Sequence, residues 1–128
     1  MAPLAHWQAQ PDRPYAPASL ARDGTVHCSP APETVLASAT RFHRDTTGRL
    51  VALVIDQSRL GAPVEWTSPA PGSPLDGTGL LFPRIRGPID RAAVVGIREI
   101  VRDGQGRALE LRTGRLQEDG ISGSGRTR

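Results

Sequence analysis

Two short segments of the chain carry side chains that could bind or transform a small molecule. In the first, His27 and Ser29 stand two residues apart in a stretch whose β-branched residues predict a short strand over 25–28. Because side chains alternate along a strand, His27 and Ser29 would share one face and Cys28 the other. A histidine beside a hydroxyl can move a proton or hold a ribose by hydrogen bonds. The alternative is a structural pair, with His27 bonded to backbone and Ser29 capping the next helix.

The second segment is a predicted strand that contains Arg84 and Arg86, which alternate onto one face. Two guanidinium groups in this arrangement suit a carboxylate, phosphate or pyrophosphate, which each can bind through two hydrogen bonds. The alternative is a solvated strand edge, where arginine discourages aggregation. Trp66 is a candidate stacking surface for a ligand ring, although a place in the core or in a cleft wall is its commoner role.

Two further residues are candidate ligand contacts: Tyr15 and Arg41. Tyr15 also fits an apolar anchor, and Arg41, on a predicted helix, also fits a surface ion pair. Cys28 fits a small buried apolar residue, because a nucleophilic cysteine needs a lowered pKa and an open approach. The three histidines lack the spacing of metal ligands and there is no second cysteine, so we expect no metal site.

The elements that would position these residues follow from hydrophobic periodicity. The apolar run Leu50 to Ile55 predicts a central strand buried on both faces. Residues 32–43 predict the main helix, with Val35, Leu36, Ala39 and Phe42 on one face and the Ser29 hydroxyl as cap. We expect a helical turn at 56–60 and further strands at 64–67, 80–86 (broken at Pro83), 93–101 and 107–112, with a hairpin turn at 103–106.

The remaining segments predict less regular structure. Residues 1–20 are rich in proline and predict an extended, irregular lead-in pinned by Trp7 and Tyr15. Prolines and glycines predict a loop at 68–79, and the glycine- and serine-rich residues 114–128 predict a disordered tail. One helix among five or six strands predicts a single α+β domain over residues 1–113.

Composition narrows the class of protein. The chain has 128 residues and a formal net charge of +3, and all 16 basic residues are arginine. This usage indicates a GC-rich genome, and two of the arginines, Arg126 and Arg128, lie in the predicted tail. No arginine cluster is interleaved with aromatic residues, so we do not expect a nucleic-acid partner. The longest apolar run is too short to span a membrane and we find no secretory leader, so we expect a cytoplasmic protein.

Several segments in order resemble a bacterial and plant family known as domain of unknown function family 952, whose members carry G-F-I-H-C-S where this chain has Gly24 to Ser29. The resemblance covers roughly residues 7–97. It continues through 53–56, Leu60-Gly61-Ala62-Pro63-Val64-Glu65-Trp66, Phe82-Pro83-Arg84-Ile85-Arg86-Gly87-Pro88-Ile89 and Ala93-Val94-Val95. Where family members carry a histidine and a tyrosine in F-P-H-x-Y-G, this chain has Arg84 and Arg86.

The resemblance implies a compact relative of the ADP-ribosyltransferases, with a split, mostly antiparallel sheet around a cleft that holds NAD in active relatives. It implies that His27 and Ser29 form one wall of that cleft, Arg84 and Arg86 an anion clamp, and Trp66 an apolar wall.

Three functions stay open at this stage. We favour an enzyme, or a former enzyme, with an ADP-ribosyltransferase-like cleft for a nucleotide-derived or other anionic small molecule, with NAD as a possible cofactor. A second hypothesis is a repurposed cleft that tailors or cyclises a different small molecule in secondary metabolism. The third is a non-catalytic module that binds a protein or RNA through its arginines.

Overall fold

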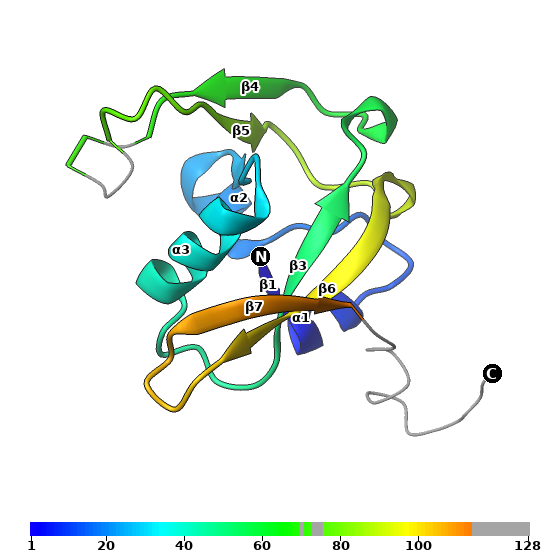
Figure 1. The fold of residues 1–128 in the computed structure, drawn as a ribbon. Helices are drawn as coiled ribbons and strands as arrows, with labels where there is room; N and C mark the ends of the chain where they lie inside the picture. Colours follow the sequence, from blue (N-terminus) through cyan, green and yellow to red (C-terminus); the bar gives the residue numbers. More distant parts are fainter. Residues whose placement is uncertain (70, 73–75, 114–128) are drawn as a thin grey trace.

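The computed structural model describes residues 1–69, 71–72 and 76–113, which form two sheets and three α-helices (Figure 1). The helices are α1 (Leu4–Gln8), α2 (Ala18–Asp23) and α3 (Pro32–Phe42). The strands are β1 (Ala2–Pro3), β2 (Val26–His27), β3 (Leu50–Ile55), β4 (Val64–Thr67), β5 (Phe82–Ile85), β6 (Val94–Arg102) and β7 (Ala108–Thr113). Short 3₁₀ turns follow β3 and precede β6, at Gln57–Arg59 and Arg91–Ala93.

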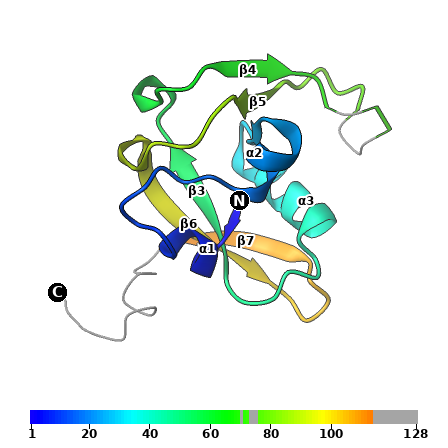
Figure 2. The same cartoon turned by 180° about the vertical axis from the view of Figure 1, so that it is seen from behind.

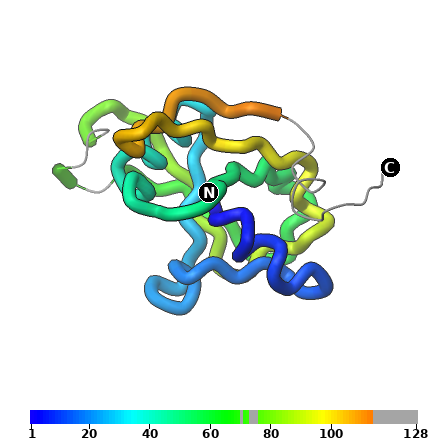
Figure 3. Tube along the Cα trace, turned by 90° about the horizontal axis from the view of Figure 1, so that it is seen from below, coloured from blue at the N-terminus to red at the C-terminus, as the bar shows by residue number. Residues whose placement is uncertain are grey.

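The two sheets have the strand orders β1-β3-β6-β7 and β2-β5-β4, and every neighbouring pair is antiparallel. The α+β class with antiparallel strands is therefore confirmed. Seen from the front and from behind, β4 and β5 lie at one end of the molecule and β7 at the other (Figures 1 and 2). The blue start of the chain lies in the middle of the molecule, where β1 pairs with β3 (Figure 3).

Strand β3 has the bounds that its apolar run predicts, because six consecutive apolar residues are accommodated only where the sheet is covered. Leu50, Val51 and Ala52 are buried, and the second half of the strand is half-buried. The prediction that β3 is buried on both faces is thus confirmed only for the first half of the strand. The second half borders a cleft, which is described below.

Helix α3 ends one residue before the predicted end, but its cap differs from the prediction. Its N-cap is Ala31, whose N–H donates to the Thr34 hydroxyl (3.3 Å) and whose carbonyl accepts from that hydroxyl (2.8 Å). Ser29 is not the cap, because Pro32 occupies the first helical position and starts the helix too far along the chain. Ala39 is buried as predicted, whereas Phe42, the last helical residue, is 67% exposed under the Arg41 guanidinium.

The predicted irregular lead-in is wrong, because β1, α1 and the first half of α2 lie within residues 1–20. Prolines were the reason for that prediction, yet Pro3 and Pro17 stand at the N-caps of α1 and α2, where a missing N–H costs nothing. The anchoring role of Tyr15 is confirmed, since this side chain is buried and its backbone pairs with Ile89. The structure thus has two short helices besides the one predicted main helix.

Pro83 does not break its strand, and it explains why β2 is short. Strand β5 runs through Pro83, which lies opposite Trp66 of β4. On its other side the Pro83 carbonyl accepts the Cys28 N–H at 3.0 Å. Proline has no N–H with which to return that bond, so the ladder stops there and β2 ends at His27 instead of Cys28.

The other predicted strands are confirmed to within two residues, as is the hairpin turn between β6 and β7, where the Gly106 N–H donates to the Asp103 carbonyl. The described part of the 68–79 loop contains no helix or strand. The predicted tail, 114–128, lies outside the described residues. Among the described residues, none of the helices has the length and apolar character needed to span a bilayer.

Candidate functional site

A cleft of about 270 Å³ lies between the two sheets. One wall comes from the three-stranded sheet and contains Val26, Cys28, Val64, Trp66, Pro83 and Ile85. The other wall is formed by β3, which contributes Ala52, Leu53 and Ile55. The remaining lining residues include Tyr15, Ser29, Val35, Gln57, Leu60 and Ile89. Met1, whose α-amino group is buried, and His27 complete the ionisable part of the lining. The cleft is therefore mainly apolar, with a few polar groups.

The register of the three-stranded sheet explains why this wall is apolar. Val26 of β2, Ile85 of β5 and Val64 of β4 lie in one row across the sheet. Pro83 and Trp66 form the next row on the same face, because alternate residues of a strand point to the same side. We call this side of the sheet the cleft face.

The charged residues of the same sheet form the row between these two. His27, Arg84 and Glu65 are register partners, so their side chains leave the sheet on the opposite side, which we call the outer face. Arg84 and Arg86 are not among the residues that line the cleft. The structure thus brings His27 and Arg84 together and separates Arg84 from Trp66.

Glu65 is the carboxylate that pairs with Arg86, and it also lies opposite Arg84 in the register of the sheet. Arg86 donates to it at 2.7 Å, and the pKa of Glu65 lies below its usual range because of this hydrogen bond and the charges of Arg86 and Arg84. Among the described residues Arg84 makes no hydrogen bond or ion pair of its own. Arg86 is therefore paired with a carboxylate of the chain itself, and the role of Arg84 and Arg86 as a clamp for an external anion stays a prediction.

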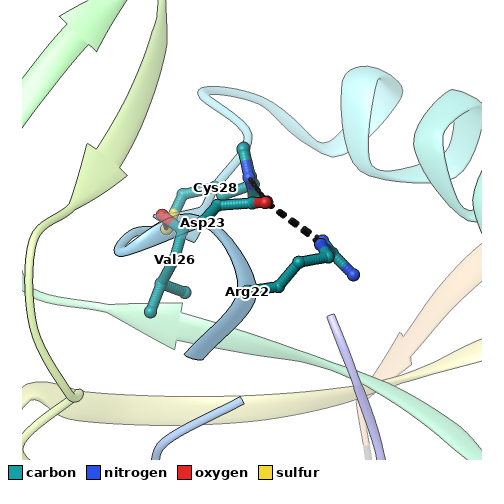
Figure 4. A network of polar contacts seen from close by, with 5 residues as sticks. Arg22, Asp23, Val26 and Cys28 are labelled. Atoms are coloured by element: carbon teal, nitrogen blue, oxygen red, sulfur yellow. Dashed lines mark hydrogen bonds and ion pairs between the residues drawn. The ribbon is translucent and has the colours of Figure 1, made fainter. Parts of the chain in front are cut away.

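His27 borders the rim of the cleft, although its side chain leaves the sheet on the outer face, where Asp23 orients it. Its Nε2 lies 3.0 Å from Asp23 Oδ2, and a carboxylate can only accept, so Nε2 carries the proton and neutral His27 keeps a lone pair on Nδ1. Asp23 also accepts two hydrogen bonds of 3.1 Å from Arg22 (Figure 4). The bonds from Arg22 and His27 lower the pKa of Asp23 to about 2, so this carboxylate is ionised at neutral pH.

Sequence reasoning missed Asp23, although its position follows from local structure. Helix α2 ends at Gly24, whose left-handed conformation (φ 77°) turns the chain directly from Asp23 into β2. The turn places a carboxylate four residues before His27 on the same side. An acidic residue followed by glycine, just before a short strand with histidine, was the available signal.

Cys28 and Ser29 continue the rim beyond His27. Burial raises the pKa of the Cys28 thiol, so the thiol stays protonated at neutral pH and is a poor nucleophile. Ser29 is half-buried, and its hydroxyl makes no hydrogen bond to another described residue. That hydroxyl is thus available to a ligand.

The two aromatic candidates both line the cleft, whereas Arg41 does not. Trp66 is 49% exposed, which leaves much of its indole surface open to the cleft and to solvent. The Tyr15 hydroxyl lies 2.9 Å from His6 Nδ1, and burial raises the pKa of Tyr15. The Tyr15 hydroxyl therefore stays protonated at neutral pH and already has a hydrogen-bond partner within the protein.

Arg91 is a second residue that sequence reasoning missed. Its Nε, Nη1 and Nη2 donate to the carbonyls of Arg13, Trp7 and Gln10, each at 2.8 Å. Its guanidinium also lies 4.0 Å from the centre of the Trp7 ring. Arg91 thereby holds in place the segment that contains Tyr15, a residue of the cleft lining.

A second hollow, of about 330 Å³, lies beside the β6–β7 turn and contains Arg44, Arg49 and Arg102. Two of these arginines already form hydrogen bonds within the protein that use much of their guanidinium groups. Arg102 donates to the carbonyls of His43, Thr46 and Gly48, and Arg49 pairs with Glu99 through two hydrogen bonds of 3.0 Å. We therefore regard the cleft between the sheets as the candidate site, although it is the smaller of the two.

We also examined the described residues for metal ligands. Within residues 1–69, 71–72 and 76–113, no three His, Cys, Asp or Glu side chains gather closely enough to hold a metal ion.

These features define a class: a small α+β protein with an apolar cleft between two antiparallel sheets. The chain belongs to the family described as Protein of unknown function (DUF952), whose model matches residues 1–97. Every residue that lines the cleft falls within that match.

The fold is similar to the crystal structure of protein CC0527 from Caulobacter crescentus. The TM-score is 0.67 at 22% sequence identity, and the alignment covers 84% of this chain and 89% of that one. At this identity the similarity shows the fold alone. No curated protein sequence matches the chain.

Proposed function

We propose that this protein binds a small, largely apolar molecule in the cleft between its sheets and acts on it as an enzyme. The observation that carries the proposal is the separation of the two faces of the three-stranded sheet, which leaves an apolar cleft with a carboxylate-supported histidine at its rim. Ligand sites are commonly apolar concavities with a few convergent polar groups, and this cleft fits that description.

The chemistry that these residues support is proton transfer. The His27 side chain leaves the sheet on the outer face, so it would act on a substrate group that extends past the rim of the cleft. There His27 can accept a proton at Nδ1, while the ionised Asp23 holds its Nε2–H and stabilises the imidazolium that forms. Ser29, two residues further on, can orient a polar group of the substrate. Such a cleft suits a tailoring or cyclising enzyme, because holding an apolar substrate in a reactive shape supplies much of the rate.

A second candidate is a nucleotide-derived ligand, as in the ADP-ribosyltransferase-like reading of the family resemblance. One observation favours it: Arg84 lies next to His27 across the sheet and makes no ion pair among the described residues. In this version a ring, such as the nicotinamide of NAD, would occupy the cleft, and the phosphates would lie outside it, over Arg84 and Arg86.

Binding can be followed through Trp66, which is one of only two tryptophans in the chain. In the Trp7→Phe variant the only indole is at the cleft, and in the matched Trp66→Phe variant the only indole is packed against Arg91. We would titrate both with a set of single-ring compounds, NAD and ADP-ribose, and record fluorescence. The proposal expects saturable changes in the first variant alone. Absence of any saturable change with all compounds would overturn it.

The catalytic part needs a separate test, once a ligand that binds is identified. His27→Gln and Asp23→Asn should leave the affinity for that ligand nearly unchanged and reduce turnover about 100-fold or more, as expected for loss of a general base. Arg22→Gln, which removes the other partner of Asp23, serves as control and should have a small effect. Full activity in His27→Gln would show that proton transfer by His27 is not part of the reaction.

A further inference from the structure

Resting on the proposed function, we infer the chemical class of the ligand: a neutral molecule with one flat ring and one neutral hydrogen-bonding substituent. The charges, surfaces and free polar groups of the cleft each support one part of this inference.

The first argument concerns charge. No arginine, aspartate or glutamate side chain is among the described residues that line the cleft. The nearest charges on the three-stranded sheet, those of Arg84 and Glu65, leave it on the outer face. Met1 also lines the cleft, and burial lowers the pKa of its α-amino group, which favours the neutral amine over the cation. An anionic group inside the cleft would therefore lose its hydration without gaining an arginine side chain, which is strongly unfavourable.

The second argument concerns the shape of the cleft face. Trp66 and Pro83 are register partners, and the Cys28 N–H is bonded to the Pro83 carbonyl, so the three residues lie side by side across three strands. Their indole, pyrrolidine ring and sulfur atom are apolar groups that all line the cleft. Opposite them, Leu53 and Ile55 of β3 line the cleft. A planar ring between these walls gains stacking on one side and aliphatic contact on the other.

The third argument concerns size. The cleft has a volume of about 270 Å³. An apolar cavity of about 150 Å³ is known to hold benzene. The cleft therefore accommodates one ring with a small substituent and lies just below the volumes of about 300–1,000 Å³ typical of drug-sized ligands.

The fourth argument concerns polar groups that remain free. The Ser29 hydroxyl and the Gln57 side chain line the cleft, and neither makes a side-chain hydrogen bond to another described residue. The Tyr15 hydroxyl, by contrast, already has one hydrogen-bond partner, His6 Nδ1. A hydroxyl and an amide each offer a donor and an acceptor without charge, so a neutral hydroxyl or carbonyl group on the ligand matches them best.

The test compares benzyl alcohol with benzoate, which share a ring and differ in the charge of the substituent, using the fluorescence of the Trp7→Phe protein at neutral pH. We expect benzyl alcohol to bind at least about ten-fold more tightly than benzoate. Ser29→Ala should weaken benzyl alcohol several-fold and leave toluene, which lacks the substituent, unchanged. Ser38→Ala, at a half-buried serine of α3 that does not line the cleft, is the matched control and should change neither.

Benzoate binding as tightly as benzyl alcohol, or more tightly, would overturn the inference of a neutral ligand while leaving a small-molecule cleft in place. Loss of that benzoate binding in Arg84→Gln would then assign the site to anions. If none of these rings binds, both this inference and the proposed function are wrong.

Discussion

The two faces of the three-stranded sheet contrast sharply, although both are built from alternate residues of the same strands, β2, β4 and β5. The cleft face presents Val26, Ile85, Val64, Pro83 and Trp66, and the outer face presents His27, Arg84 and Glu65. On the outer face cations and carboxylates neutralise one another in water, where ion pairs contribute little. The comparison teaches that the conspicuous charges and the space for a ligand lie on opposite sides of one sheet.

The largest expected effect is a difference in unfolding free energy between substitutions on the two faces. Ile85→Ala removes a side chain that is almost fully buried at the base of the cleft face, and it should cost about 2–5 kcal/mol of unfolding free energy. Its sequence neighbour Arg84, changed to alanine, should cost less than about 0.5 kcal/mol. Urea denaturation measures both. Equal losses would contradict the assignment of the two faces.

Arg91 extends the comparison to a third arginine. Its guanidinium holds three backbone carbonyls, whereas among the described residues the arginines of the outer face hold no backbone segment in place. Arg91→Lys cannot reproduce three hydrogen bonds from one planar group, and it should cost about 2 kcal/mol. Arg86→Lys, at the exposed pair with Glu65, should stay within about 0.5 kcal/mol. Thermal or urea unfolding of the two variants side by side would decide, and similar losses would speak against this difference.

Pro83 offers a smaller and more local test. Replacing it by alanine supplies the N–H that β5 lacks, so residue 83 should return the bond to Cys28 and lengthen β2 by one residue. We expect the new amide to exchange with solvent more slowly than those of the exposed residues Leu80 and Leu81, with a change in stability below about 1 kcal/mol. Hydrogen exchange followed by NMR measures this, and an unprotected amide would refute our explanation of the short β2.

The smallest effect concerns pH and the support of His27. The folded-state pKa of Asp23 is lowered to about 2, so its ionised form stabilises the fold above the pKa of the unfolded chain. That stabilisation is lost as pH falls from about 4 through about 2. Denaturation of the wild type and Asp23→Asn across this range should show a weaker acid dependence in the variant. An identical dependence would mean that Asp23 is not held as described.

Much of this fold could be predicted because local patterns determine it. The run Leu50 to Ile55 has no other stable place than a covered strand, and Asp103 to Gly106 has the composition of a hairpin turn. The lead-in could not be predicted, since Pro3 and Pro17 start helices there and the same residues also suit extended chain.

The site was harder to predict, because it depends on register. Alternation along β5 separates Arg84 from Pro83 and Ile85, but it does not tell which side meets β3. That choice is made by pairing across strands distant in sequence, such as Trp66 with Pro83. The family resemblance was confirmed over residues 1–97, while the roles of His27, Ser29, Arg84 and Arg86 stay predictions.

The most direct test of the central claim is an NMR titration with benzyl alcohol that observes both faces of the sheet at once. Side-chain methyl groups of Val26, Val64 and Ile85 report on the cleft face, and the Nε–H groups of Arg84 and Arg86 report on the outer face. Our account predicts saturable shifts of the methyl resonances with the arginine resonances unchanged. Shifts confined to the arginines, or no saturable shift at the methyl groups, would contradict it.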